Sequence, residues 1–171
     1  MLIRADWRRG RRGDAMRMIA TMLAVAATAG CADIPRDPER TEAQVRDSGT
    51  IRLGVVAGTP PSPAREAALK ELNIGAAVQT RTGDSEHLLR DLEEGRIDLV
   101  HGHFAMDSPW AKKVHLGRAL GYRAEPAAHV AAPRFAYRNG ENGWIMEVER
   151  AAARRAVQRA ADAQAEGGAR P

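Results

Sequence analysis

The sequence predicts an α/β fold: a small, open, mainly parallel sheet with flanking helices. Two observations predict this class. Short apolar runs typical of buried strands occur at residues 50–57, 76–82 and 97–101, and helical patterns lie between them at residues 64–72 and 84–94. Strands that alternate with helices at this spacing form right-handed crossovers and a parallel sheet. The first strand is therefore expected between the other two, in the order 2-1-3.

The first strand ends in a loop because of its prolines. Residues 50–57 alternate in polarity and then become continuously apolar, which is typical of a central strand. Prolines at positions 60, 61 and 63 cannot donate to a sheet, so residues 58–63 are predicted to form a loop, with Pro63 in the first turn of the next helix. The half-polar alternation of residues 76–82 favours an edge strand.

Residues 84–94 have the start, the buried face and the stop of a helix. Asp84 and Ser85 are N-cap residue types, three leucines share one face, and Gly95 is a natural residue just past a helix end. A strand follows at once, and the chain breaks at Gly102. Ligands of open α/β sheets bind outside this carboxyl end of the strands.

The C-terminal part is predicted from weaker patterns. Residues 111–116 resemble a short helical turn, and residues 129–132 form a candidate additional strand. Turn residues then precede a long Ala/Arg-rich helix over 144–165, whose first half should dock on the sheet. Residues 166–171 are predicted to be a disordered tail.

The N-terminal part resembles a bacterial lipoprotein leader. An apolar stretch, 19–29, is too short to span a bilayer and ends in Thr28-Ala29-Gly30-Cys31. Residues 1–30 are predicted to be a signal peptide, with Met16 or Met18 as alternative starts, and Cys31 to be the lipidated residue. The alternative is a buried structural cysteine.

The predicted domain plan follows from this leader. Residues 31–46 are polar and contain two prolines, which suits a lipid-anchored tether, part of which can form a short helix. Residues 47–165 are then a single lobe. The expected location is the periplasmic side of a bacterial membrane.

The charge distribution argues against a nucleic-acid partner. The formal net charge is +4, but residues 1–30 contain six Arg and two Asp, which leaves 20 basic and 20 acidic residues in the rest of the chain. A neutral mature chain lacks the basic footprint that nucleic-acid binding requires.

Three segments carry a family resemblance: SGTIRLGV at residues 48–55, EGRIDLVHG at 94–102 and DSPWAKKVHLGRAL at 107–120. They resemble the first lobe of periplasmic solute-binding proteins of ABC transporters, of the polar amino-acid type (extracellular solute-binding family 3). The resemblance covers residues 47–120. It implies one lobe of a type II periplasmic binding protein and a role in transport or sensing.

The chain departs from this family in two respects. Complete members have two lobes that close on the ligand, whereas this chain has room for one, so the second lobe is predicted to be absent. Trp110 also stands where the family commonly has an arginine that pairs with the ligand's carboxylate, and Asp107 lies near the usual threonine. An α-amino acid is therefore a poor expected ligand. Trp110 would either stack on an apolar or cationic ligand, with Asp107 as the anion, or pack over the end of the sheet.

The candidate ligand-binding residues lie in the loops after the three parallel strands. They are Thr59, Pro60, Asp84, Ser85, Gly102, His103, Asp107, Ser108 and Trp110.

The third strand carries two histidines that could contribute to a metal site. His101 and His103 are two residues apart, so they share a face of the strand, and a third ligand would have to come from His115, His129 or Asp107. Without a recognised ligand motif, no metal and no cofactor are expected.

No enzymatic activity is predicted. The serines lack a G-x-S-x-G context and the glycines do not form G-x-G-x-x-G. Two functions remain: a solute-binding lipoprotein that serves an ABC transporter or a sensor, or a non-catalytic periplasmic interaction module that kept one lobe and binds a protein. The expected partners are a small solute, a transporter permease or another periplasmic protein, and the membrane through the lipid anchor.

Overall fold

The computed structural model describes residue 37, residues 39–72 and residues 74–168, with side chains as far as residue 158. Its elements in chain order are α2 (Thr41–Ser48), β1 (Thr50–Val56), α3 (Pro63–Glu71), β2 (Ala77–Gly83), α4 (Ser85–Glu93), β3 (Leu99–Phe104), the 3₁₀ helix η1 (Pro109–Lys112), β4 (Val114–Leu116), β5 (Ala132–Arg138) and α5 (Asn142–Gly168). No helix among these described residues is both long enough and apolar enough to cross a membrane.

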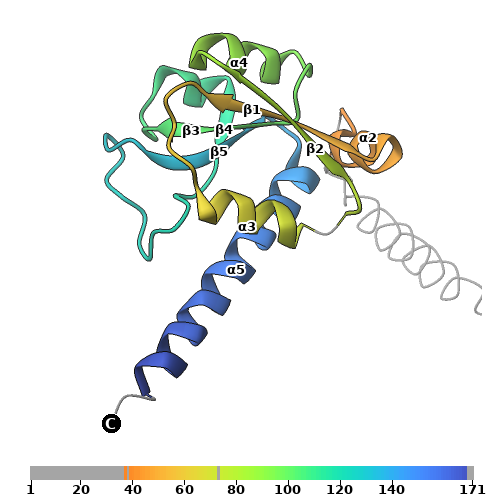
Figure 1. The fold of residues 1–171 in the computed structure, drawn as a ribbon. Coiled ribbons are helices and arrows are strands. Elements are labelled where there is room, and N and C mark those ends of the chain that lie inside the picture. The colour runs from red at the N-terminus through yellow and green to blue at the C-terminus, as the bar shows by residue number, and fades with distance from the viewer. Residues whose placement is uncertain (1–36, 38, 73, 169–171) are drawn as a thin grey trace, which may run out of the picture. The chain divides into compact units, whose positions relative to one another are not determined.

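The sheet has five strands in the order β2-β1-β3-β5-β4 (Figure 1). β1 pairs in parallel with β2 on one side and with β3 on the other. β5 runs antiparallel to both β3 and β4. The predicted α/β class and the 2-1-3 order of the parallel strands are therefore confirmed. Leu53 of β1 lies directly opposite Leu99 of β3, and both are fully buried at the centre of the sheet.

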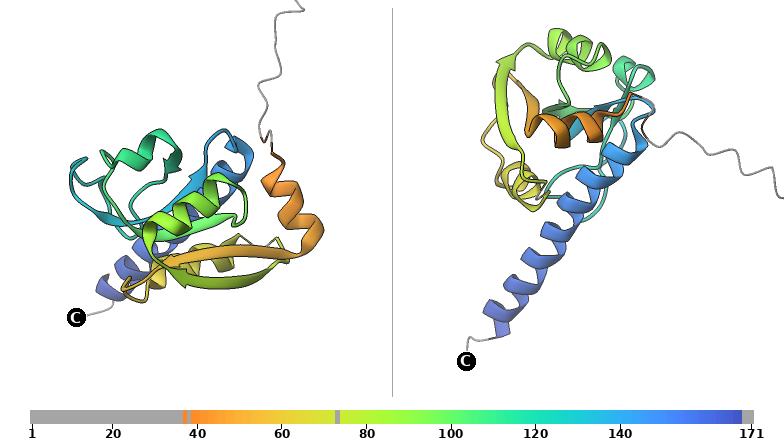
Figure 2. Two further views of the ribbon diagram at one scale, coloured as in Figure 1. Left: turned by 90° about the horizontal axis from the view of Figure 1, so that it is seen from above. Right: turned by 90° about the vertical axis from the view of Figure 1, so that its right-hand side faces the viewer.

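Helices cover both faces of the sheet. α4 lies over one face, and α3 with the first half of α5 lies over the other, as the further views show (Figure 2). The α4 face is closed by Leu88, Leu89 and Leu92, the three leucines expected there. The opposite face is closed by a larger cluster that includes Trp144 of α5. Trp144 Nε1 donates to the Asp98 carbonyl (3.0 Å), which ties α5 to the start of β3.

The segment between residues 109 and 138 differs from the expectation. The helical turn predicted at 111–116 is a 3₁₀ helix at Pro109–Lys112 followed by the short strand β4, and the strand predicted at 129–132 lies instead at Ala132–Arg138. The physical reason is pairing: β5 is sandwiched between β3 and β4, and four of its central residues are buried. Proline and arginine residues interrupt the apolar pattern of β5, so the sequence alone does not indicate that this strand is buried.

The folded body begins before residue 47, because residues 41–46 of the segment expected to be a tether belong to helix α2. Val45 of α2 is part of the core. The Glu141 carboxylate accepts the backbone N–H groups of Glu39 (2.7 Å) and Thr41 (2.9 Å), which anchors the start of α2 to the start of α5. At the other end, α5 continues to Gly168 and so includes the first residues of the predicted tail.

Candidate functional site

The loops that carry the predicted ligand residues lie along one edge of the sheet. Because β1, β2 and β3 are parallel, their carboxyl ends meet at the same edge. The Ala57 N–H donates to the Gly83 carbonyl (2.8 Å), so the exits of β1 and β2 are joined by a hydrogen bond. Thr59 and Pro60 follow β1, Asp84 and Ser85 follow β2, and the remaining candidates follow or end β3. Their role in binding stays a prediction.

Asp84 is committed to its own helix. Its carboxylate accepts the backbone N–H of His87 (3.0 Å) and lies 2.7 Å from His87 Nδ1. The backbone hydrogen bond is the main cause that holds the pKa of Asp84 below its usual value. Ser85 is the first residue of α4. Asp84 therefore caps the helix, which is the role that local spacing predicts.

Trp110 packs against the end of the sheet. Its side chain is half-buried against the core cluster under α4, and the Lys113 ammonium lies 5.3 Å from its ring centroid. A cation from the same chain therefore already occupies the position in which a cationic ligand would stack. The neighbouring Asp107 side chain is exposed, and the Asp107 N–H donates to Ala128 (3.2 Å).

Gly102 and His103 differ in accessibility. Gly102 is buried, and a Cβ atom there would lie 2.7 Å from Val56 and 2.9 Å from Phe104, so Gly102 allows close packing within the sheet. His103 is exposed at the end of β3. It is the more accessible of these two candidates.

His101 shares a face with His103 but is fully buried. Its ring meets the edge of Phe135 at a centroid distance of 5.7 Å. Burial lowers the pKa of His101 to about 4, with the positive charges of Arg65 and His103 adding to the shift. His101 is therefore neutral at pH 7. Within the described part of the chain, no group of three or more His, Cys, Asp or Glu side chains is placed to hold a metal ion.

Arg134 lies beside the candidate site, and the sequence did not predict its role there. Its side chain is fully buried on β5, where Nε donates to the Phe104 carbonyl (2.9 Å). Its Nη1 donates to the Gly117 carbonyl (2.8 Å) and to the Glu125 carboxylate (2.6 Å). Through these hydrogen bonds, Arg134 holds the loop of residues 117–131 beside the carboxyl end of β3. The only local indication was an arginine inside the apolar run of residues 130–137, and its partners lie too far along the chain to be read from that pattern.

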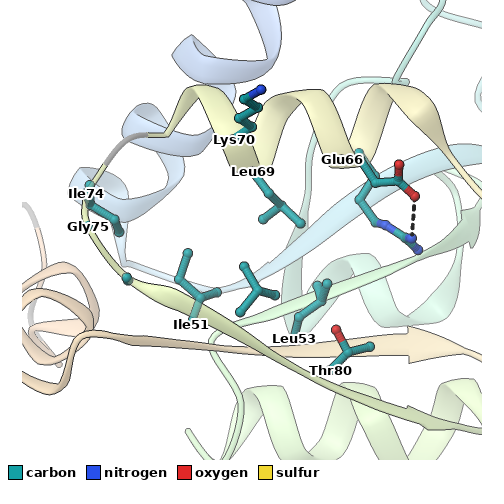
Figure 3. Close-up of a pocket in the computed structure, with 11 residues that line it drawn as sticks. Ile51, Leu53, Glu66, Leu69, Lys70, Ile74, Gly75 and Thr80 are labelled. Carbon is teal, nitrogen blue, oxygen red and sulfur yellow. Dashed lines mark ion pairs between the residues drawn. The ribbon is translucent and has the colours of Figure 1, made fainter.

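A hollow of about 500 Å³ lies between α3 and β2 (Figure 3). Its apolar lining is formed by Ile51, Leu53, Leu69, Ile74 and Val78. Polar groups of Lys70, Thr80 and the Arg65–Glu66 ion pair (3.5 Å) surround it. None of the predicted ligand residues lines this hollow, so the predicted edge and the hollow are separate features.

Comparisons with known proteins identify the fold. No protein-family model matches the chain, and no curated protein is detectably similar to it in sequence. Among solved structures, it is similar to the arginine-bound form of domain 1 from TmArgBP of T. maritima, with 14% identity and a TM-score of 0.55 over 65% of this chain and 97% of that chain. An ancestral cationic amino acid solute binding protein matches with 13% identity and a TM-score of 0.53 over 67% of this chain and 93% of the other.

The chain has the fold of one lobe of a type II periplasmic solute-binding protein. The L-cystine solute receptor of Neisseria gonorrhoeae, in its unliganded open conformation, agrees with this, at 9% identity and a TM-score of 0.50 over 67% of this chain and 90% of that chain. At these identities the likeness is one of fold. It confirms the single-lobe architecture that the sequence resemblance implied.

Proposed function

We propose that the chain is the solute-binding lobe of a lipoprotein that captures a small solute for an ABC transporter or for sensing. The observation that carries the proposal is the gathering of the loops after β1, β2 and β3 at one edge of a solute-binding-protein lobe. A single lobe of this fold can bind a ligand, because one of the similar structures is the arginine-bound form of domain 1 from TmArgBP. The proposal assigns no catalytic step to the chain.

The ligand should differ from a free α-amino acid. In the resembling family an arginine commonly binds the ligand's carboxylate through two parallel hydrogen bonds, and Trp110 stands in its place. The Trp110 ring is already contacted by Lys113. Asp107 and His103 are exposed polar side chains at the edge. They favour a small amine or another polar solute that needs no carboxylate grip.

A calorimetric screen of amino acids and amines against the purified chain tests this proposal. A single lobe contacts a ligand on one side only, so we expect dissociation constants of roughly 0.1–1 mM. Amino acids should bind no better than their uncharged analogues, and Asp107→Asn should weaken amine binding, whereas Asp47→Asn on α2 should not. Micromolar binding of an amino acid by a monomer would contradict the proposed ligand class.

Lipidation of Cys31 is the second part of the proposal. Cys31 lies outside the described residues, and the support is its place after the apolar stretch 19–29. Replacing it with Ser should move the protein from the membrane fraction to the soluble periplasmic fraction. Unchanged partitioning into membranes would count against lipid anchoring.

A further inference from the structure

β2 has an open outer edge. In the sheet of described residues β2 pairs with β1 alone, and six of its seven residues are exposed. The Ala77 N–H donates to Gly49 and the Gly83 carbonyl accepts from Ala57, both at 2.8 Å, so the odd-numbered residues of β2 bond to β1. The N–H and C=O groups of Val78, Thr80 and Thr82 therefore point outward, because backbone direction alternates along a strand.

This edge lacks the usual protection against pairing. Natural edge strands are blocked by proline, lysine, bulges or short length. β2 contains no proline or lysine and pairs with β1 in continuous register over all seven of its residues. Its only charged residue, Arg81, is drawn into an ion pair with Asp91 on the α4 side. The edge is thus long, regular and ready to accept another strand.

The edge is complementary to a second copy of itself. If two β2 strands pair antiparallel about a two-fold axis at Thr80, each outward residue meets an outward residue: Thr80 meets Thr80, and Val78 meets Thr82. This register forms reciprocal backbone hydrogen bonds at every outward position and pairs β-branched side chains, which favour neighbouring strands. Gln79 then lies opposite Arg81 of the second copy, with no like charges facing each other.

The same two-fold axis would also place the hollow of one copy beside the hollow of the other. Glu66 and Lys70 lie one turn apart on α3, and both are among the residues that line the hollow. A two-fold axis at Thr80 sets the two α3 helices antiparallel, so Glu66 of one copy faces Lys70 of the other. The same axis covers the apolar lining, which includes Val78 at 41% exposure. A strand of unrelated sequence would satisfy the backbone groups but would not by itself match these charges.

We propose that two copies of this chain associate through β2, which joins their sheets across a two-fold axis at Thr80 and closes the hollow between α3 and β2. The predicted ligand residues of β1 and β3 follow or end strands that take no part in this pairing, whereas Asp84 and Ser85 directly follow β2. The inference does not depend on the proposed solute.

Charge substitutions at Thr80 test the axis, because this position meets itself in the dimer. Sedimentation of the purified full chain should give twice the chain mass. Thr80→Lys and Thr80→Asp, each alone, should sediment as monomers because like charges then face each other. An equal mixture of the two variants should recover the dimer. Val157→Lys, a lysine at an exposed position of α5, serves as the matched control and should remain dimeric.

Thermal melting of each variant separates loss of pairing from loss of folding, because Thr80 is exposed and should tolerate both changes. A parent chain that is monomeric at roughly 100 µM would overturn the proposal. So would a dimer that persists in Thr80→Lys, or a mixture of the two charged variants that stays monomeric while each variant melts like the parent.

Discussion

His101 shows how one residue couples burial to charge. The side chain is buried against Phe135, and neither ring nitrogen has a hydrogen-bond partner among the described residues. Protonation would place a positive charge in this apolar site, near the guanidinium of Arg65. The fold therefore holds His101 neutral, and that preference makes the stability of the protein depend on pH.

We predict that His101→Leu reduces the acid sensitivity of the protein. The pKa of His101 in the folded chain, about 4, is below the ordinary value of 6.5. Its contribution to stability is therefore complete above pH 6.5 and is lost as the pH falls towards 4, by up to about 3 kcal/mol. Urea denaturation at pH 7.5 and pH 4.5 should show a smaller loss of unfolding free energy in the variant.

The matched control is His129→Gln, at an exposed position. It should retain the pH dependence of the parent. An equal acid-induced loss in His101→Leu and the parent would mean that His101 is protonated as easily in the folded chain as in the unfolded one.

At the scale of elements, buried charged side chains join segments that are far apart in the sequence. Glu141 at the start of α5 holds the N-terminus of α2 across about a hundred residues. Arg134 of β5 holds the loop of residues 117–131 through Gly117 and Glu125, and it ties the loop to the Phe104 carbonyl at the end of β3. Glu141 accepts from two backbone N–H groups at the start of a helix, and Arg134 donates to two backbone carbonyls that follow or end a strand, so both side chains satisfy backbone groups at the ends of elements.

Arg134→Met is expected to release the loop of residues 117–131. Methionine fills a similar volume but leaves the carbonyls of Phe104 and Gly117 without their donor, so the unfolding free energy should fall by about 2–4 kcal/mol. Hydrogen exchange should rise in residues 117–131 more than in β1. Arg118→Met makes the same chemical change at an exposed position of the loop and should have little effect. Unchanged exchange in Arg134→Met would exclude this role.

At the scale of the whole molecule, one sheet separates two apolar clusters. The larger cluster lies under α3 and α5, and the smaller one lies under α4. β1 and β3 are the central parallel strands, and their residues alternate between the two clusters. Gly54 of β1 shows how tightly the α4 face is packed, because a Cβ atom there would lie 2.9 Å from Ile97 and 3.1 Å from Leu88.

Leu99→Ala should destabilise the whole lobe. Leu99 is fully buried opposite Leu53, so truncation leaves a cavity at the centre of the sheet and should cost about 2–5 kcal/mol. Chemical denaturation measures this loss. Val157→Ala removes methyl groups at a position that is 71% exposed, and it should change stability by less than about 0.5 kcal/mol. A loss below roughly 1 kcal/mol in Leu99→Ala would contradict the central position of β3.

The sequence by itself determined the parallel core of the fold, because the features that specify β1 to β3 are local. Ser62 and Asp84 cap their helices, Gly95 ends α4 with a positive φ of 74°, and the prolines after β1 stop the strand. Parallel strands share a carboxyl edge, so the same local features also brought the predicted ligand loops to one place.

The tertiary structure alone decided the elements and contacts that depend on distant partners. β5 is a strand because β3 and β4 flank it, and α2 belongs to the body because Val45 reaches the core and Glu141 caps its first turn. Likewise, only the folded chain shows that Lys113 already contacts Trp110 and that Arg134 organises the neighbouring loop. Local propensity cannot encode these contacts, because their energy comes from burial and hydrogen bonding between segments that meet only after the chain has folded.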